Sequence, residues 1–241
     1  MVNELIAYCG PAAVPEDVWL RWNTDPVLIA ALAALAFWVT RRAANPRAGW
    51  AAIVLMALVF ISPLCALSSA LFSVRVLHHV ILVSAAAPLL ALAFPQRRAG
   101  VVPLALLVAA HAVALWVWHA PGPYAWGLAT VPGYWLMQIT LLGSAWWMWR
   151  AILANTTPNG SALVALAVTV GQMGLLGALI VFASGPLYPV HFASTLEWGF
   201  TPLSDQQLAG LLMWVPAMLP YLATGLWLAW TSLRPNTEVA L

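Results

Sequence analysis

Apolar segments of membrane-spanning length recur along this chain, and they constrain its fold more than any other feature. The clearest covers residues 74–94, where no charged residue follows Arg75 before the segment ends. A helix that crosses a bilayer needs about 20 mainly apolar residues. Charged residues make up only 7% of the sequence, whereas a soluble domain carries about a quarter. The sequence therefore predicts an all-α, polytopic transmembrane helix bundle embedded in a lipid bilayer.

Seven such segments are indicated by their apolar runs, by aromatic residues near their ends and by arginines beside them. They cover about residues 26–40, 49–67, 74–94, 101–119, 131–149, 161–184 and 206–230. On this division residues 1–25 form an N-terminal arm, residues 26–232 a seven-helix transmembrane domain and residues 233–241 a short tail. We expect the arm to remain in the mature chain, because it lacks the basic start and unbroken apolar run of a secretory signal.

The arginines orient the predicted spans. If the N-terminus lies outside, only Arg21 and Arg75 are extracytoplasmic. The cytoplasmic arginines are then Arg41, Arg42, Arg47, Arg97, Arg98, Arg150 and Arg234. Because arginine and lysine concentrate in cytoplasmic loops, this distribution predicts an outside N-terminus and a cytoplasmic C-terminus. The chain has a net charge of only +2 and no basic block, which argues against nucleic acid as a partner.

Side chains that can bind a metal gather in the predicted outer half of the spans. They are His78, His79, His119, His191, Cys65 and Met213. Imidazole, thiolate and thioether ligands suit copper, and two facing transmembrane histidines can instead hold a haem. Each residue type also has an ordinary structural use: interfacial histidines cap helices, and methionine and cysteine fill packing gaps. The sequence leaves these alternatives open.

Three residues of this region carry alternatives of their own. His111 lies eight residues before His119, about 12 Å deeper in the helix, where a hydrogen bond between helices would account for it. Cys9 and Cys65 both face the predicted oxidising side, so a disulfide between them is allowed. A free Cys65 would instead be a candidate copper ligand.

Arg75 departs from the charge bias because it lies on the predicted outer side. It precedes His79 by one helical turn and therefore shares a helix face with it. A cation at that position suits an anionic partner, such as a haem propionate or Asp205. An exposed arginine beside the membrane surface is the simpler alternative.

Small residues and prolines predict local features of individual spans. Gly171, Gly174 and Gly177 lie along one side of the sixth span and allow another helix to approach closely. Pro88 and Pro216 lie inside spans, and we expect each to kink its helix.

Several short motifs together resemble a known family. They are Ser62-Pro63-Leu64, His78-His79, Trp118-His119-Ala120-Pro121, Pro202-Leu203-Ser204-Asp205-Gln206-Gln207-Leu208-Ala209-Gly210 and Met213-Trp214. Over about residues 19–232 the chain resembles the polytopic CtaG family of cytochrome c oxidase assembly factors. That family is distinct from the single-span periplasmic copper chaperone that shares its name.

The resemblance implies a non-catalytic, multi-pass protein of the bacterial inner membrane. Such a protein acts with haem-copper oxidase subunits and assists copper delivery or insertion on the periplasmic side. By position, the family's histidines correspond to His79 and His119, and its loop–helix motif to Asp205 and Gln206.

Two departures and two competing functions accompany this resemblance. Family members often carry further histidines near the positions of Arg75 and of Tyr134 or Gln138, and this chain has none there. A haem-binding membrane oxidoreductase subunit, with His79 and His119 as axial ligands, is one alternative function. A copper or small-solute permease is the other, although the spans show neither deep charges nor an inverted repeat.

Overall fold

The computed structural model describes residues 8–233, and the regular elements of that part of the chain are helical. The longer helices are α1 (Pro26–Arg42), α2 (Pro46–Ile61), α6 (Leu104–His119), α8 (Val131–Ile152), α9 (Asn159–Val181), α11 (Pro202–Trp214) and α12 (Leu219–Leu233). The shorter helices are α3 (Leu64–Ala70), α4 (Phe72–Val80), α5 (Ala87–Ala93), α7 (Pro121–Ala129) and α10 (Ser194–Glu197). Short 3-10 turns occupy Val18–Leu20, Pro189–His191 and Pro216–Met218, and a π-helical turn covers Ile81–Ala86.

Three continuous helical stretches, two of which join several of these elements, are long and apolar enough to cross a membrane. They are Phe72–Ala93, Asn159–Val181 and Pro202–Leu233. The number rises to five if two bent pairs each count as one span, α2 with α3 at 50° and α6 with α7 at 77°. The described residues thus confirm an all-helical chain with three to five candidate spans, while seven spans and their orientation remain predictions.

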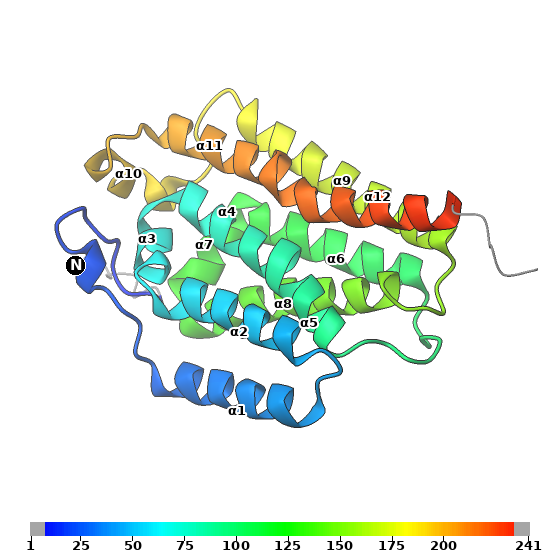
Figure 1. The fold of residues 1–241 in the computed structure, drawn as a ribbon. Helices are drawn as coiled ribbons and strands as arrows, with labels where there is room; N and C mark the ends of the chain where they lie inside the picture. The colour runs from blue at the N-terminus through cyan, green and yellow to red at the C-terminus, as the bar shows by residue number, and fades with distance from the viewer. Residues whose placement is uncertain (1–7, 234–241) are drawn as a thin grey trace, which may run out of the picture.

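The helices lie side by side along a common direction, with α1 at one edge of the bundle (Figure 1). The described arm, α3, α7 and α10 gather at one end of the bundle, which we call the outer end. The α1–α2 and α5–α6 connections lie at the opposite end, as does the end of α12. Residues 234–241 of the predicted tail, which include Arg234, and residues 1–7 of the predicted arm lie outside the described residues.

Pro88 is accompanied by a π-helical turn in the residues just before it. Proline has no N–H, so Pro88 cannot complete the hydrogen bond of an α-helical turn. The chain widens just before it into the π-helical turn, where the Ala87 N–H bonds to the Leu82 carbonyl five residues back. Pro216 similarly begins a 3-10 turn between α11 and α12. The fourth predicted span ends at His119, as α6 does, although the sequence did not predict that the chain continues there as α7.

Two glycines allow α9 and α11 to approach each other closely. A Cβ added at Gly177 would lie 2.9 Å from the Gly210 carbonyl oxygen, and one added at Gly210 would lie 2.7 Å from the Gly177 carbonyl oxygen. Only glycine permits backbones to meet this closely. Gly174 contributes less, with the indole of Trp214 3.6 Å from its added Cβ, and nothing lies within 4 Å at Gly171. The prediction of a close-packing glycine face therefore holds at Gly177 and is wrong at Gly171.

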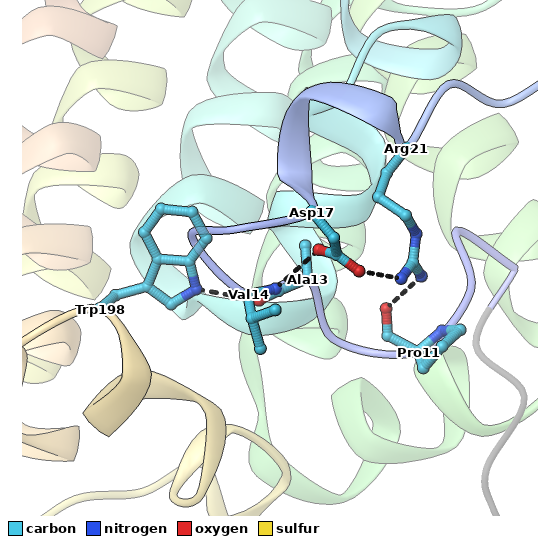
Figure 2. A network of polar contacts seen from close by, with 6 residues as sticks. All are labelled: Pro11, Ala13, Val14, Asp17, Arg21 and Trp198. Carbon is cyan, nitrogen blue, oxygen red and sulfur yellow. Dashed lines mark hydrogen bonds and ion pairs between the residues drawn. The ribbon is translucent and has the colours of Figure 1, made fainter.

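The N-terminal arm packs onto the outer end through a small polar network (Figure 2). The Trp198 indole, from the segment between α9 and α11, donates a hydrogen bond to the Ala13 carbonyl at 3.0 Å. Within the arm, Arg21 pairs with Asp17 at 2.9 Å and donates to the Pro11 carbonyl at 2.9 Å. The arm is thereby tied to a connection almost two hundred residues away in the sequence.

A disulfide between Cys9 and Cys65 fixes the arm to α3, with 5.3 Å between the two Cα atoms. The sequence left this bond and a free thiol as alternatives. Because both sulfurs are consumed by the bond, Cys65 has no thiolate for a metal. The prediction of Cys65 as a copper ligand is therefore wrong for this structure.

Candidate functional site

Two histidines from different helices meet inside the outer half of the bundle. His79 on α4 and His119 at the end of α6 place their ring centres 5.7 Å apart, with the rings nearly perpendicular. Both side chains are buried, with 2% and 3% exposure. Nδ1 of His119 donates to the Leu115 carbonyl at 2.7 Å, so Nε2 carries the lone pair. That nitrogen, and both ring nitrogens of His79, have no hydrogen-bond partner.

His78 belongs to a different contact. The ring centre of His78 lies 6.0 Å from that of His79. The His78 ring also packs nearly perpendicular to the Phe60 ring of α2, with 4.9 Å between the ring centres. The side chain is fully buried and neither ring nitrogen has a partner. Adjacent residues on a helix point about 100° apart, which is why only one member of the histidine pair can face His119.

The histidines form a pair rather than a larger ligand cluster. Among the described residues, no group of three or more His, Cys, Asp or Glu side chains is placed to hold a metal ion. Met213, the thioether candidate, is buried in α11. Two imidazoles at this separation can bind one ion and leave part of its coordination shell open.

Arg75 is the most unusual side chain of the site. It is fully buried, and none of its three guanidinium nitrogens has a hydrogen-bond partner. Its guanidinium lies 5.2 Å from the ring centre of Tyr134. The hydroxyls of Tyr124 and Tyr134 also lie close to it, so that its positive charge acts on both. The alternative of an exposed arginine beside the membrane surface is therefore wrong for Arg75.

The surroundings of Arg75 offset only part of the cost of burying it. Removing an ionic group from water costs several kcal/mol even after the protein relaxes. A cation–π contact returns about 0.5–2 kcal/mol. The ion pair Arg21–Asp17 is the one found among residues 8–233, so Arg75 has no carboxylate against it there. The suggested pairing with Asp205 is not formed.

Asp205 instead caps the first turn of α4. Its carboxylate accepts the Phe72 N–H at 2.7 Å and the Ser73 N–H at 3.2 Å, and also accepts the Ser73 hydroxyl. Leu71, at the N-cap position, offers no side-chain bond of its own. Negative groups are favourable at helix N-termini, so Asp205 stabilises the helix that carries Arg75 and His79.

Gln206 performs a similar structural role beside it. Its side-chain oxygen accepts the Leu187 N–H at 2.6 Å, and its amide nitrogen donates to the Ile180 carbonyl at 3.1 Å. The residue thereby joins α11 to the end of α9 and the segment that follows. Trp214 completes this junction, because it packs against Gly177.

His191 lies in the segment between α9 and α11 and is held on both sides. The Tyr124 hydroxyl donates to its Nε2 at 2.7 Å, and its Nδ1 donates to the Ala70 carbonyl at 3.3 Å. Burial, followed by the nearby positive charge of Arg75, lowers the pKa of His191 to about 4. His191 is therefore a neutral structural connector rather than a free ligand.

His111 confirms the structural alternative given for it. Its Nδ1 lies 3.0 Å from the Ser144 hydroxyl on α8, so it joins α6 to α8.

A comparison with models of protein families finds a match, which covers most of the C-terminal part of the chain. Residues 101–235 match the family model of the cytochrome c oxidase caa3 assembly factor, CtaG. The chain belongs to this family. No curated protein and no solved structure matches the sequence.

The region matched by the CtaG family model divides the site. It begins before α6 and includes His119, Asp205 and Gln206. It excludes α4, so Arg75 and His79 lie outside it. The fold unites the two parts, since α4 packs against α11 and its His79 faces α6.

Sequence reasoning missed the aromatic surroundings of the site. Tyr134 lies beneath Arg75, and Tyr8 of the arm stacks on Tyr134 with 4.7 Å between ring centres. The Tyr8 hydroxyl donates to Asp25 at 2.6 Å, which lowers the pKa of that carboxyl. One signal was available: Tyr134 and Gln138 are polar residues one turn apart in an otherwise apolar segment, which indicates a polar helix face.

Proposed function

We propose that this CtaG family member assists cytochrome c oxidase assembly by binding copper between His79 and His119 and passing it to an oxidase subunit. The two facing imidazoles are the observation that carries the proposal. With metal–nitrogen bonds of about 2 Å, two imidazoles on one ion have ring centres roughly 5–6.5 Å apart. The separation of 5.7 Å falls within that range.

The chemistry of the pair suits copper as cargo. Imidazole is a good copper ligand, and low-coordinate sites favour the reduced ion. The Leu115 carbonyl fixes the tautomer of His119 and orients its ring, as outer hydrogen bonds commonly do at metal sites. Two protein ligands leave positions open for a ligand of the recipient, and copper can then move by stepwise ligand exchange.

The disulfide supports an extracytoplasmic position for this site. Disulfides persist in oxidising compartments and are rare in the cytosol. The Cys9–Cys65 bond lies at the outer end, where the arginine distribution also predicts the outside face. We accordingly place the protein in the bacterial inner membrane, with copper reaching the histidines from the periplasmic side.

Copper(I) binding by the purified protein tests the proposal directly. A coloured copper(I) chelator is titrated against the wild type, His79→Ala and His119→Ala, with His111→Ala as the matched control. We expect one copper per chain, lost in the first two variants and kept in the control. Equal binding by all four proteins would contradict the assignment, and a Soret absorption band in the purified protein would favour the haem alternative.

A deletion strain tests the role in assembly. We expect low oxidase activity with the oxidase subunits still produced, and recovery on adding copper or the wild-type gene but not the His79→Ala gene. Unchanged oxidase activity after deletion would refute the assembly function for this protein.

A further inference from the structure

A buried positive charge beside the histidine pair lacks a counter-charge. Arg75 is fully buried, and Nε, Nη1 and Nη2 have no hydrogen-bond partner. Asp205, the carboxylate suggested for it by the sequence, is occupied by the first turn of α4. The charge of Arg75 also acts on the rings of His78 and His79.

The groups around Arg75 are neutral and rich in hydrogen-bond donors. The hydroxyls of Tyr124 and Tyr134 lie beside it, and Gln138 interacts with the same Tyr134 hydroxyl. The side chain of Gln138 is buried, and neither its nitrogen nor its oxygen has a hydrogen-bond partner. Guanidinium, hydroxyl and amide N–H groups all donate to anions. The Tyr124 hydroxyl already donates to His191, so three donor groups, those of Arg75, Tyr134 and Gln138, remain in this buried region.

We propose that Arg75, with Tyr134 and Gln138, binds a small monovalent anion of about halide size. The side-chain polar atoms of Arg75 and Gln138 are shielded from solvent, so the region suits an ion of atomic size rather than a haem propionate attached to its macrocycle. The anion supplies the counter-charge that the cation–π contact with Tyr134 does not.

This site deepens the proposed function, and its link to copper rests on that function. A copper ion at His79 and His119 would add a second positive charge close to Arg75. Like charges repel strongly in a region of low dielectric constant, so an anion on Arg75 favours copper binding. Because such coupling is reciprocal, copper must favour the anion by the same factor.

The anion site is tested first without copper. The thermal unfolding of the purified protein is measured as chloride replaces methanesulfonate at constant ionic strength. We expect the unfolding temperature to rise by roughly 3–5 °C for each tenfold increase of chloride above its dissociation constant. Arg75→Gln should abolish this response, and Arg21→Gln, which removes an arginine of the arm, should keep it.

If Arg75→Gln does not fold, a second variant and a direct measurement of chloride binding still test the anion site. Tyr134→Phe keeps the ring beneath Arg75 and removes only the hydroxyl, so it should weaken the chloride response. Line broadening of the chloride-35 NMR signal by the wild type should be relieved by bromide. A wild type that neither responds to chloride nor broadens its signal overturns the inference, as does a folded Arg75→Gln protein with the full response.

Copper affinity then separates this inference from the proposed function. With a copper(I) indicator calibrated in each salt, we expect binding to weaken on the order of tenfold when methanesulfonate replaces chloride. A chloride response without any copper binding would refute the proposed function and leave the anion site in place. Copper binding that is equal in both salts, in a protein that shows no chloride response, would refute only the anion site.

Discussion

Replacing Asp205 by alanine removes the acceptor of three hydrogen bonds at the start of α4. The Phe72 and Ser73 N–H groups and the Ser73 hydroxyl lose their partner, and no side chain at the N-cap can take over. Each buried donor left unpaired costs about 1–3 kcal/mol. The hydroxyl can rotate to another acceptor, so the two N–H groups dominate the loss.

We therefore expect Asp205→Ala to lower the free energy of unfolding by about 3–5 kcal/mol. Asp205→Asn keeps one oxygen acceptor and loses the favourable charge at the helix N-terminus, so it should cost about 1–2 kcal/mol. For a chain of this size 1 kcal/mol corresponds to roughly 2–4 °C of unfolding temperature. The alanine variant should thus unfold at least about 6 °C below the wild type.

Tryptophan fluorescence of the detergent-purified proteins during heating measures these shifts. Glu197→Gln, which removes an exposed acidic group at the same end of the bundle, is the matched control. Copper(I) binding by Asp205→Asn should equal that of the wild type, because Asp205 touches neither His79 nor His119. The reasoning fails if Asp205→Ala shifts the unfolding temperature no further than the control does.

Three further predictions follow from separate contacts. Replacing Cys9 and Cys65 by serine releases a bond between residues 56 apart, and should cost up to about 4 kcal/mol and expose the arm to limited proteolysis; an arm that stays protected would contradict this. Gly210→Ala places a Cβ 2.7 Å from a backbone oxygen and should cost about 1–3 kcal/mol in thermal unfolding, whereas Gly143→Ala, with nothing within 4 Å, should cost none. The pKa of His191 in the folded protein is lowered to about 4, so between pH 6.5 and 4 the unfolded state binds a proton that the folded state does not. The free energy of unfolding should therefore fall by about 3 kcal/mol over this range. His191→Gln should reduce this pH dependence of thermal stability.

Membership of the CtaG family, an all-helical chain and the positions of most helices could be predicted from local features of the sequence. Apolar runs and proline positions act within one segment, so they indicated the end of α6 near His119 and an irregularity in the helix that carries Pro88. The meeting of His79 with His119 and the burial of Arg75 could not be predicted in the same way. A helix pattern fixes which residues share a face, and leaves open which other helix that face contacts.

The sequence by itself determined that this chain is a set of apolar helices with its histidines near one end, because burial in a membrane requires that composition residue by residue. Only the tertiary structure decided that His79 meets His119, that Arg75 is buried over Tyr134, and that Asp205 reaches a helix more than 130 residues earlier in the chain. The rotation of each helix about its axis is set by the packing of all its neighbours at once, so no single segment contains that information.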